Sequence, residues 1–357
     1  MSERSSTREF LLDQYARYPA SRLQDFRKAL YQSTFGCGHL VNDPLAAEDW
    51  IRREAAESVS ASRTVERLDG PWHRVPLSIL AEGLTPKTLA AAFAGSAAIP
   101  GAGTADLEKR LTVLLTLIRE RQLPFSAEQA EDEIRVWRTE GFPACRHSQA
   151  YRNAYHPAYR VLHARYVRLL PLLAAIDRLL AKKSGILLAI EGGSTSGKST
   201  LAELLTGIYP DTALFHADDF FLRPEQRTEA RFAQPGGNMD RERLEAEILA
   251  PLSRGEDAAY RPFNCQTMSL GAPRRSRFAR LNIVEGAYSL HPELEHYYDL
   301  SLFLKISPET QRRRVLKRNG PEWGQTFFER WIPLENTYFR DTRTAERCTL
   351  QLEEDSE

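Results

Sequence analysis

The chain has 357 residues, which is longer than a single hydrophobic core usually organises, so we expect two domains. Lysine plus arginine and aspartate plus glutamate both number 48, so the formal net charge is zero. This balance removes any global electrostatic attraction to nucleic acid or to an anionic membrane, and we expect neither as a partner.

The cysteines and the first residues indicate the compartment in which the protein works. Its four cysteines are far apart in sequence and form no CxxC pair. The opening MSERSSTREF lacks the apolar stretch of a signal peptide, and no window of about 18 apolar residues exists to span a membrane. These features predict a soluble protein in the reducing cytoplasm. They do not determine the oligomeric state, and a homo-oligomer is one possibility.

Residues 1–183 follow a helical pattern. Apolar residues recur at three- and four-residue spacing in LLDQYARY, LQDFRKALYQ, AAEDWIRREAA, TLAAAF, LEKRLTVLLTLIRE and YRVLHARYVRLLPLLAAIDRLLA. Strand-like alternation is largely missing, and turn-forming runs rich in Gly and Pro separate the periodic segments. The pattern predicts an all-α domain, whose role the sequence does not reveal.

Residues 184–357 follow a different pattern, which opens with the short apolar run ILLAI. Further strand-like runs are TALFHA, RLNIVEG, LSLFLKI and CTLQL, and the helical runs between them are KSTLAELLTGIY, DRERLEAEILAPLS and PETQRRRVLKRNG. Alternation of this kind is typical of a parallel sheet with crossover helices. We therefore expect an α/β domain over residues 184–357.

A glycine-rich motif directly follows the first strand of this domain. The segment EGGSTSGKST contains G-x-x-x-x-G-K-[ST], with Gly192, Gly197, Lys198 and Ser199 at the required positions, and it opens the helix KSTLAELL. Strand, motif and helix together predict a P-loop, or Walker A motif, that binds a nucleotide. We expect the nucleotide to contact Gly192, Gly193, Ser194, Thr195, Ser196, Gly197, Lys198, Ser199 and Thr200.

Each residue type in this motif has a physical reason. Glycines let backbone N–H groups converge on phosphates, and the helix N-terminus adds partial positive charge. Lys198 can supply a mobile full charge to the β- and γ-phosphate oxygens, and Ser199 can place its hydroxyl on Mg²⁺. ATP and Mg²⁺ are therefore the expected cofactors, with the choice between ATP and GTP left open.

Carboxylates at the ends of the next strands decide between phosphoryl transfer and other P-loop functions. Asp218 in FHADDFFL follows a strand-like run and could accept a proton from a substrate hydroxyl, with Asp219 as its rival. Glu285 in RLNIVEGAYSL ends another apolar run, which suits a group that holds Mg²⁺ directly or through water. The sequence therefore predicts a base and a metal ligand beside the P-loop.

The order GGSTSGKST, DDFF, VEGAYSL and then an arginine-rich helix resembles the uridine kinase, phosphoribulokinase and bacterial pantothenate kinase group, from about Ile186 to Leu352. The resemblance implies a P-loop kinase that phosphorylates a hydroxyl of a small molecule, with Asp218 as the catalytic base. It also implies substrate-binding positions, which fall on Asp219, Phe220, Phe221, Asp240, Phe263 and Asn264. Phe263 and Asn264 stand where the family has a Tyr-Asp pair, which puts nucleoside specificity in doubt.

The segment SPETQRRRVLKRNG resembles the family's lid helix, whose arginines close over the transferred phosphate. Its candidates are Arg312, Arg313, Arg314 and Arg318, and we assign a catalytic role with Lys198 to Arg314 and Arg318. An ordinary solvated basic helix face is the alternative interpretation of this run.

A small-molecule kinase with a nucleoside-like or other metabolite as acceptor is the favoured function. The alternatives are a P-loop ATPase or nucleotide-sensing regulator whose helical domain carries the output, and a kinase acting on a macromolecule. In the helical domain, the segment from His147 to Arg160 is dense in tyrosine and arginine. It is either a binding surface or ordinary packing material with snorkelling side chains.

Overall fold

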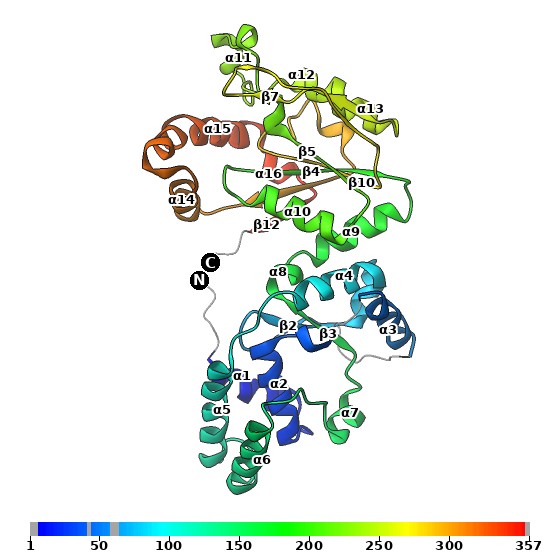
Figure 1. Cartoon of the computed structure of the whole chain (residues 1–357), viewed down its shortest axis with the longest axis vertical. Helices are drawn as coiled ribbons and strands as arrows, with labels where there is room; N and C mark the ends of the chain where they lie inside the picture. The colour runs from blue at the N-terminus through cyan, green and yellow to red at the C-terminus, as the bar shows by residue number, and fades with distance from the viewer. Residues whose placement is uncertain (1–5, 41–43, 58–63, 354–357) are drawn as a thin grey trace. The chain divides into compact units, whose positions relative to one another are not determined.

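The computed structural model describes residues 6–40, 44–57 and 64–353. Contacts divide the chain into two compact units, Met1–Ala174 and Ala175–Glu357, drawn from blue to green and from green to red in Figure 1. Helix α9 (Leu170–Leu180) crosses this division. Its last turns belong to the second unit, where Asp177 accepts a hydrogen bond of 3.0 Å from the Tyr209 hydroxyl.

Helices make up most of the first unit. They are α1 (Thr7–Arg17), α2 (Leu23–Phe35), α3 (Pro44–Glu57), α4 (Pro86–Ala97), α5 (Thr104–Arg119), α6 (Ala127–Thr139), α7 (Gln149–Tyr155) and α8 (Ala164–Val167), with 3₁₀ turns at Gly38–Leu40 and Leu77–Glu82. Their apolar stripes face one another: α2 buries Phe26 and Leu30, and α5 buries Leu107 and Leu111.

The first unit also contains a small antiparallel sheet, so the prediction of an all-α domain is wrong in this detail. Strands β1 (Glu66–Arg67), β2 (Trp72–Pro76) and β3 (Tyr159–His163) pair in the order β1-β2-β3. The sequence analysis placed Tyr159–His163 in a long helix. His156 has φ 42° and Pro157 follows it, which ends α7 and starts an extended segment that pairs with β2.

The second unit is built on a five-stranded parallel sheet, as predicted. Its strands are β4 (Ile186–Gly192), β5 (Thr212–His216), β10 (Leu281–Glu285), β11 (Leu300–Lys305) and β12 (Leu350–Glu353), in the order β12-β11-β4-β10-β5. All of β4 is buried, as expected for the central strand of a sheet covered on both faces. The carboxyl ends of β4, β10 and β5 therefore meet at one edge.

Helices connect the strands of this sheet. They are α10 (Lys198–Ile208), α11 (Glu229–Phe232), α12 (Arg241–Leu244), α13 (Ala250–Ser253), α14 (Pro308–Thr326), α15 (Ile332–Thr342) and α16 (Thr344–Arg347), with π-helical turns at Glu245–Leu249 and Phe327–Trp331 and 3₁₀ turns at Ala217–Phe220, Pro224–Gln226 and Glu295–Tyr297. A buried cluster joins Leu244 and Ile248 to Phe215 and Val284 of the sheet, which fixes one face.

Two short antiparallel pairs complete the second unit. Strands β6 (Ala258–Tyr260) and β9 (Arg274–Ser276) pair with each other, and β7 (Phe263–Asn264) pairs with β8 (Ser269–Leu270). Among the described residues, no helix is both long and apolar enough to span a bilayer.

Candidate active site at the ends of the parallel strands

The phosphate-binding loop connects β4 to α10 at the centre of the sheet. Gly192 and Gly197 have φ of 149° and 92°, a region that favours glycine. A Cβ on Gly192 would lie 2.6 Å from the Leu304 carbonyl oxygen, so no other residue fits there. The Lys198 ammonium donates to the carbonyl oxygens of Gly192 and Gly193, both at 2.9 Å. The loop thus wraps around its own lysine.

Glu285 ends β10 beside this loop. Its Oε1 accepts a hydrogen bond of 3.0 Å from the Ser199 hydroxyl and lies 2.6 Å from His216 Nδ1. Burial acts to raise the pKa of Glu285, but His216, Lys198 and Ser199 together lower it below its ordinary value. The same contact raises the pKa of His216. Glu285 is therefore held as a carboxylate.

Ser199 and Glu285 fit the chemistry of a magnesium site. A hydroxyl and a carboxylate are hard oxygen donors of the kind Mg²⁺ prefers, and Mg²⁺ usually keeps several waters besides one or two protein ligands. The two side chains meet at 3.0 Å, next to the phosphate-binding loop. The Ser196 hydroxyl in this loop is buried without a hydrogen-bond partner among the described residues.

Asp218 follows β5, the strand that neighbours β10. Its side chain reaches solvent, but surrounding protein atoms desolvate the carboxyl and raise its pKa. Lys198, His216 and Arg318 favour the charged form, whereas Glu285 opposes it. A carboxyl with a raised pKa is a stronger proton acceptor than an ordinary aspartate.

The other residues of the DDFF segment point to different surroundings. Asp219 pairs with Arg274 of β9 at 3.3 Å. Phe220 is fully buried and stacks on Tyr260 with ring centroids 5.6 Å apart, so its ring belongs to the core rather than to an open binding surface. Phe221 is half-buried and pairs through its backbone with Met239. Only part of this segment is thus placed to meet a small molecule.

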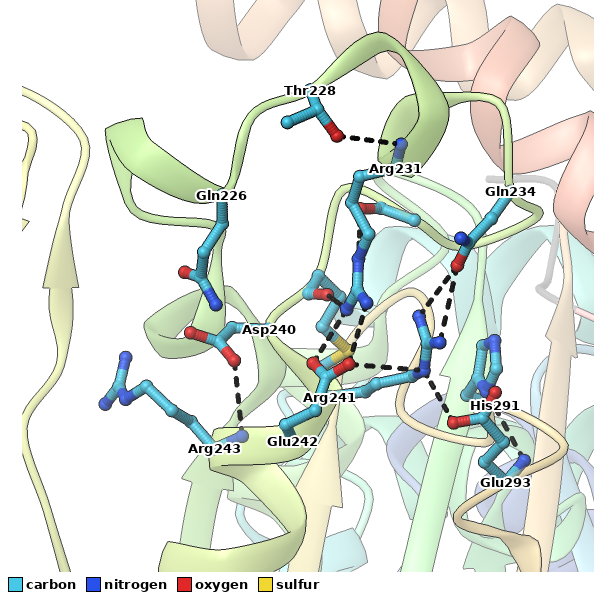
Figure 2. Close-up of polar contacts among 12 residues, drawn as sticks. Gln226, Thr228, Arg231, Gln234, Asp240, Arg241, Glu242, Arg243, His291 and Glu293 are labelled. Atoms are coloured by element: carbon cyan, nitrogen blue, oxygen red, sulfur yellow. Dashed lines mark hydrogen bonds and ion pairs between the residues drawn. The ribbon is translucent and has the colours of Figure 1, made fainter.

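The segment RFAQPGGNMD is tied down by ion pairs, as Figure 2 shows. Arg231 pairs with Glu242 at 2.7 Å and donates to the Met239 carbonyl oxygen at 2.8 Å. Arg241 pairs with Glu293, also at 2.7 Å. These contacts fix the turn that carries Asp240 into α12.

Asp240 is 1% exposed and caps α12 by accepting the Arg243 backbone N–H at 3.3 Å (Figure 2). Its other oxygen, Oδ2, accepts no hydrogen bond among the described residues, and Arg223 Nε is 3.8 Å away. A buried carboxylate oxygen normally has a hydrogen-bond partner. Asp240 therefore has acceptor capacity left for a hydroxyl group.

Phe263 and Asn264 lie in the β7–β8 pair. Phe263 is buried, with the Arg227 guanidinium 5.6 Å from its ring centroid. The Asn264 side-chain oxygen accepts the backbone N–H groups of Gln266 and Thr267, which forms the turn between the two strands. Both residues thus have structural contacts at the positions where the sequence analysis expected a substrate.

The arginine-rich helix α14 begins beside the phosphate-binding loop. Arg314 donates to the Thr195 carbonyl oxygen at 3.3 Å, and Arg318 contributes positive charge near Asp218. Arg312 instead lies over the Phe328 ring, 4.7 Å from its centroid. At Gly320, φ is 73° and a kink before Pro321 divides α14. Of the predicted arginines, Arg314 and Arg318 are thus the pair associated with the site.

Three residues of this site were not predicted from the sequence. Glu335 of α15 accepts both the backbone N–H and the hydroxyl of Ser194, and Gln311 of α14 donates to the Ser194 carbonyl oxygen at 3.0 Å. His216 pairs with Glu285. The only sequence signal was for His216, because it ends a parallel strand next to the strand that Glu285 ends. Glu335 follows the loop by well over a hundred residues in an ordinary helical pattern.

Comparisons with known proteins concern the fold of the second unit. A scan against family models finds no match, and a search of curated proteins finds none either. Among solved structures, the chain is similar to one described as a possible uridine kinase from Bacillus stearothermophilus. The identity is 20%, the TM-score is 0.39, and the match covers 51% of this chain and 99% of the other.

Two further structures match over a similar part of the chain. Phosphoribulokinase from Rhodobacter spheroides has 10% identity and a TM-score of 0.36, covering 48% of this chain and 70% of the other. D-glycerate 3-kinase from Cryptococcus neoformans has 15% identity and a TM-score of 0.35, covering 46% and 84%. By its own strand order and glycine-rich loop, the C-terminal unit is a parallel α/β sheet with a P-loop between β4 and α10, as its sequence predicted.

Proposed function

We propose that this protein transfers the γ-phosphoryl group of ATP to a hydroxyl of a small molecule. The observation that carries the proposal is the position of Asp218, which follows the strand next to β10 and interacts electrostatically with Lys198 and Glu285. A proton acceptor next to a phosphate-binding lysine is required for transfer to a hydroxyl. A nucleotide switch has no need of it.

Each residue of the site has a proposed role in the reaction. Backbone N–H groups of the loop and Lys198 would hold the phosphates, and Ser199 with Glu285 would hold Mg²⁺, which neutralises charge on the phosphates. Asp218 would orient the acceptor hydroxyl and take its proton as the acceptor oxygen bonds to the γ-phosphorus. The bond to the bridging oxygen then breaks and ADP leaves. Arg314 and Arg318 would stabilise the charge on the transferred group.

The acceptor is proposed to be a hydroxyl-bearing small metabolite. Asp240 Oδ2 supports this, because a carboxylate oxygen that has an arginine at 3.8 Å but accepts no hydrogen bond can bind a second hydroxyl of the acceptor. Phe263 and Asn264 have other contacts and give no support for a nucleoside in particular. Sugars, sugar acids and nucleosides therefore all belong in the test.

The test is ADP release by the purified full chain with Mg-ATP, alone and with pooled nucleosides, vitamins, sugars or sugar acids. A kinase shows release that depends on one pool and yields a product heavier by one phosphoryl group. Release that is the same with and without acceptors would instead support the alternative, a P-loop ATPase or nucleotide-sensing regulator whose first unit carries the output. No release under any condition would contradict both enzyme functions.

A further inference from the structure

The first unit contains a cavity of about 220 Å³, which is lined only by residues of this unit. It is lined by Tyr18, Thr64, Glu66, Arg74, Pro76, Tyr151, Ala154, Tyr155, His156, Pro157, Ala158 and Tyr159. Most of these residues come from the sheet β1-β2-β3 and from the segment that joins α7 to β3. Ligand pockets for drug-sized molecules are about 300–1,000 Å³, so this one suits a smaller metabolite.

A buried cation lies in the wall of this cavity. Arg74 is 3% exposed, and its Nε and Nη1 donate to Gln32, Gln14 and Glu66 at 3.0–3.2 Å. Its Nη2 is buried and has no hydrogen-bond partner among residues 6–40, 44–57 and 64–353. Leaving a charged donor unpaired is costly, and an acceptor oxygen in the cavity would remove that cost.

A carboxylate lies next to this cation in the same wall. Glu66 Oε2 is 3.2 Å from Arg74 Nη1, and Oε1 accepts from the Gln14 amide. A carboxylate can accept about four hydrogen bonds, so Glu66 keeps acceptor capacity. The cavity wall therefore presents one positive and one negative group side by side, with no net charge between them.

Four tyrosine rings form a further part of the wall. The ring centroids of Tyr18, Tyr151 and Tyr155 lie 4.8–5.3 Å from one another, and Arg74 lies over the Tyr159 ring at 5.1 Å. The faces of such rings carry partial negative charge and attract ammonium groups.

Buried hydrogen bonds hold this wall in place. His147 stacks on Tyr151 with ring centroids 4.1 Å apart, and its two ring nitrogens contact Asp25 at 2.9 Å and the Tyr159 hydroxyl at 2.6 Å. Asp25 also accepts the N–H and hydroxyl of Ser148. The segment from His147 to Arg160 thus supplies both packing contacts and part of the cavity wall.

We propose that this cavity binds a small zwitterion of the amino-acid type, with its carboxylate toward Arg74 and its ammonium between Glu66 and the tyrosine faces. A simple carboxylate would meet repulsion from Glu66, and a simple amine would leave the free donor of Arg74 unpaired. A molecule with both charges a few bonds apart matches both groups. The site is distinct from the proposed nucleotide site and does not depend on it.

The test is isothermal titration of the full chain, without nucleotide, against each of the twenty free L-amino acids, with acetate and ethylamine as comparison ligands. We expect at least one amino acid to bind and neither comparison ligand to match it. Absence of binding by every amino acid at 10 mM, on the order of the weakest affinity relevant to a metabolite, would overturn the proposal. Acetate or ethylamine binding as tightly as the best amino acid would also overturn it.

Two variants and one matched control test whether the ligand binds in this cavity. Ala154→Phe fills the cavity from an exposed position on α7, and Asn153→Phe is the matched control because its side chain does not line the cavity. Glu66→Gln keeps the shape of the wall and removes its negative charge. We expect Ala154→Phe and Glu66→Gln each to weaken binding about tenfold or more and Asn153→Phe to leave it unchanged. Equal affinity in Ala154→Phe and the wild type would place the ligand elsewhere and overturn the assignment.

Discussion

Glu335 of α15 holds Ser194 of the phosphate-binding loop with both of its carboxylate oxygens, at 2.8 Å to the backbone nitrogen and 2.5 Å to the hydroxyl. The carboxylate is buried, and burial raises its pKa although the bonds from Ser194 oppose the rise. The loop is thus held from outside by a residue that follows α14 in sequence. The shape of the phosphate-binding loop therefore depends on the position of α15, because Glu335 joins them.

Replacing Glu335 tests this coupling. Hydrogen bonds to charged groups contribute about 1.5–3 kcal/mol, so Glu335→Ala should raise the KM for ATP about tenfold or more by loosening the loop. Glu335→Gln keeps one acceptor oxygen and should have a smaller effect. Glu329→Ala, at an exposed position of the preceding π-helical turn, is the control. Steady-state kinetics that do not distinguish Glu335→Ala from this control would refute the coupling.

Asp218→Asn should keep ATP affinity and lose most turnover, because the substitution removes proton acceptance and leaves the phosphate-binding loop unchanged. General-base catalysis contributes about 10²–10⁴-fold, so kcat should fall within that range. Asp211→Asn, which breaks only the ion pair with Arg277 at 2.7 Å, serves as the control. Turnover near the wild-type value in Asp218→Asn would move the role of base to another residue, with Asp219 as the first choice.

The pH dependence of turnover follows from the same residue. Desolvation by the surrounding protein atoms raises the pKa of the Asp218 carboxyl above its ordinary value of 3.8, and a base works only in its deprotonated form. As the pH falls through the raised pKa, kcat/KM should decrease with a single-proton slope, and the midpoint should lie above 3.8. A rate that stays constant down to the ordinary aspartate pKa would contradict this role.

Stability should also depend on pH, through Glu191 at the end of β4. This residue is fully buried and accepts the backbone N–H groups of Gly192, Tyr288 and Leu290, yet burial raises its pKa from 4.5 to about 7. Between these values the folded protein binds the proton that the unfolded chain has released. The free energy of unfolding should therefore fall by up to about 3 kcal/mol as the pH rises from about 4.5 to about 7. Above that range it should level off.

Urea denaturation of the wild type and of Glu191→Gln at several pH values measures this contribution. Glutamine does not titrate, so the unfolding free energy of the wild type minus that of Glu191→Gln should decrease as the pH rises from about 4.5 to about 7. Hydrogen exchange of β4 confirms that the transition followed is the unfolding of the second unit. A stability difference that is independent of pH would show that Glu191 does not titrate in this range.

The sequence was sufficient to predict features that rest on local pattern. The loop from Gly192 to Ser199 combines a strand, a spaced motif and a helix within a short segment, and the strands β5, β10, β11 and β12 coincide with strand-like runs of the sequence. For the same reason Lys198 and Glu285 could be placed beside each other, because parallel strands end at one edge.

Features that depend on distant contacts were not predictable in this way. Tyr159–His163 has helical spacing, but its pairing with β2, which lies far earlier in the chain, determines that it forms a strand. Phe220 has the residue type of a binding surface, and only the packing of Tyr260 and the sheet makes it core. Glu335 reaches Ser194 through the arrangement of α14 and α15, which no local pattern encodes.

Calorimetric titration of Mg-ATP into the wild type and into Lys198→Ala tests the central claim most directly, since the proposed chemistry requires a nucleotide on the loop. The claim predicts saturable binding of one nucleotide per chain to the wild type and, because a positive charge beside the phosphates is removed, weaker binding to Lys198→Ala. Absence of binding to the wild type with either Mg-ATP or Mg-GTP would contradict it.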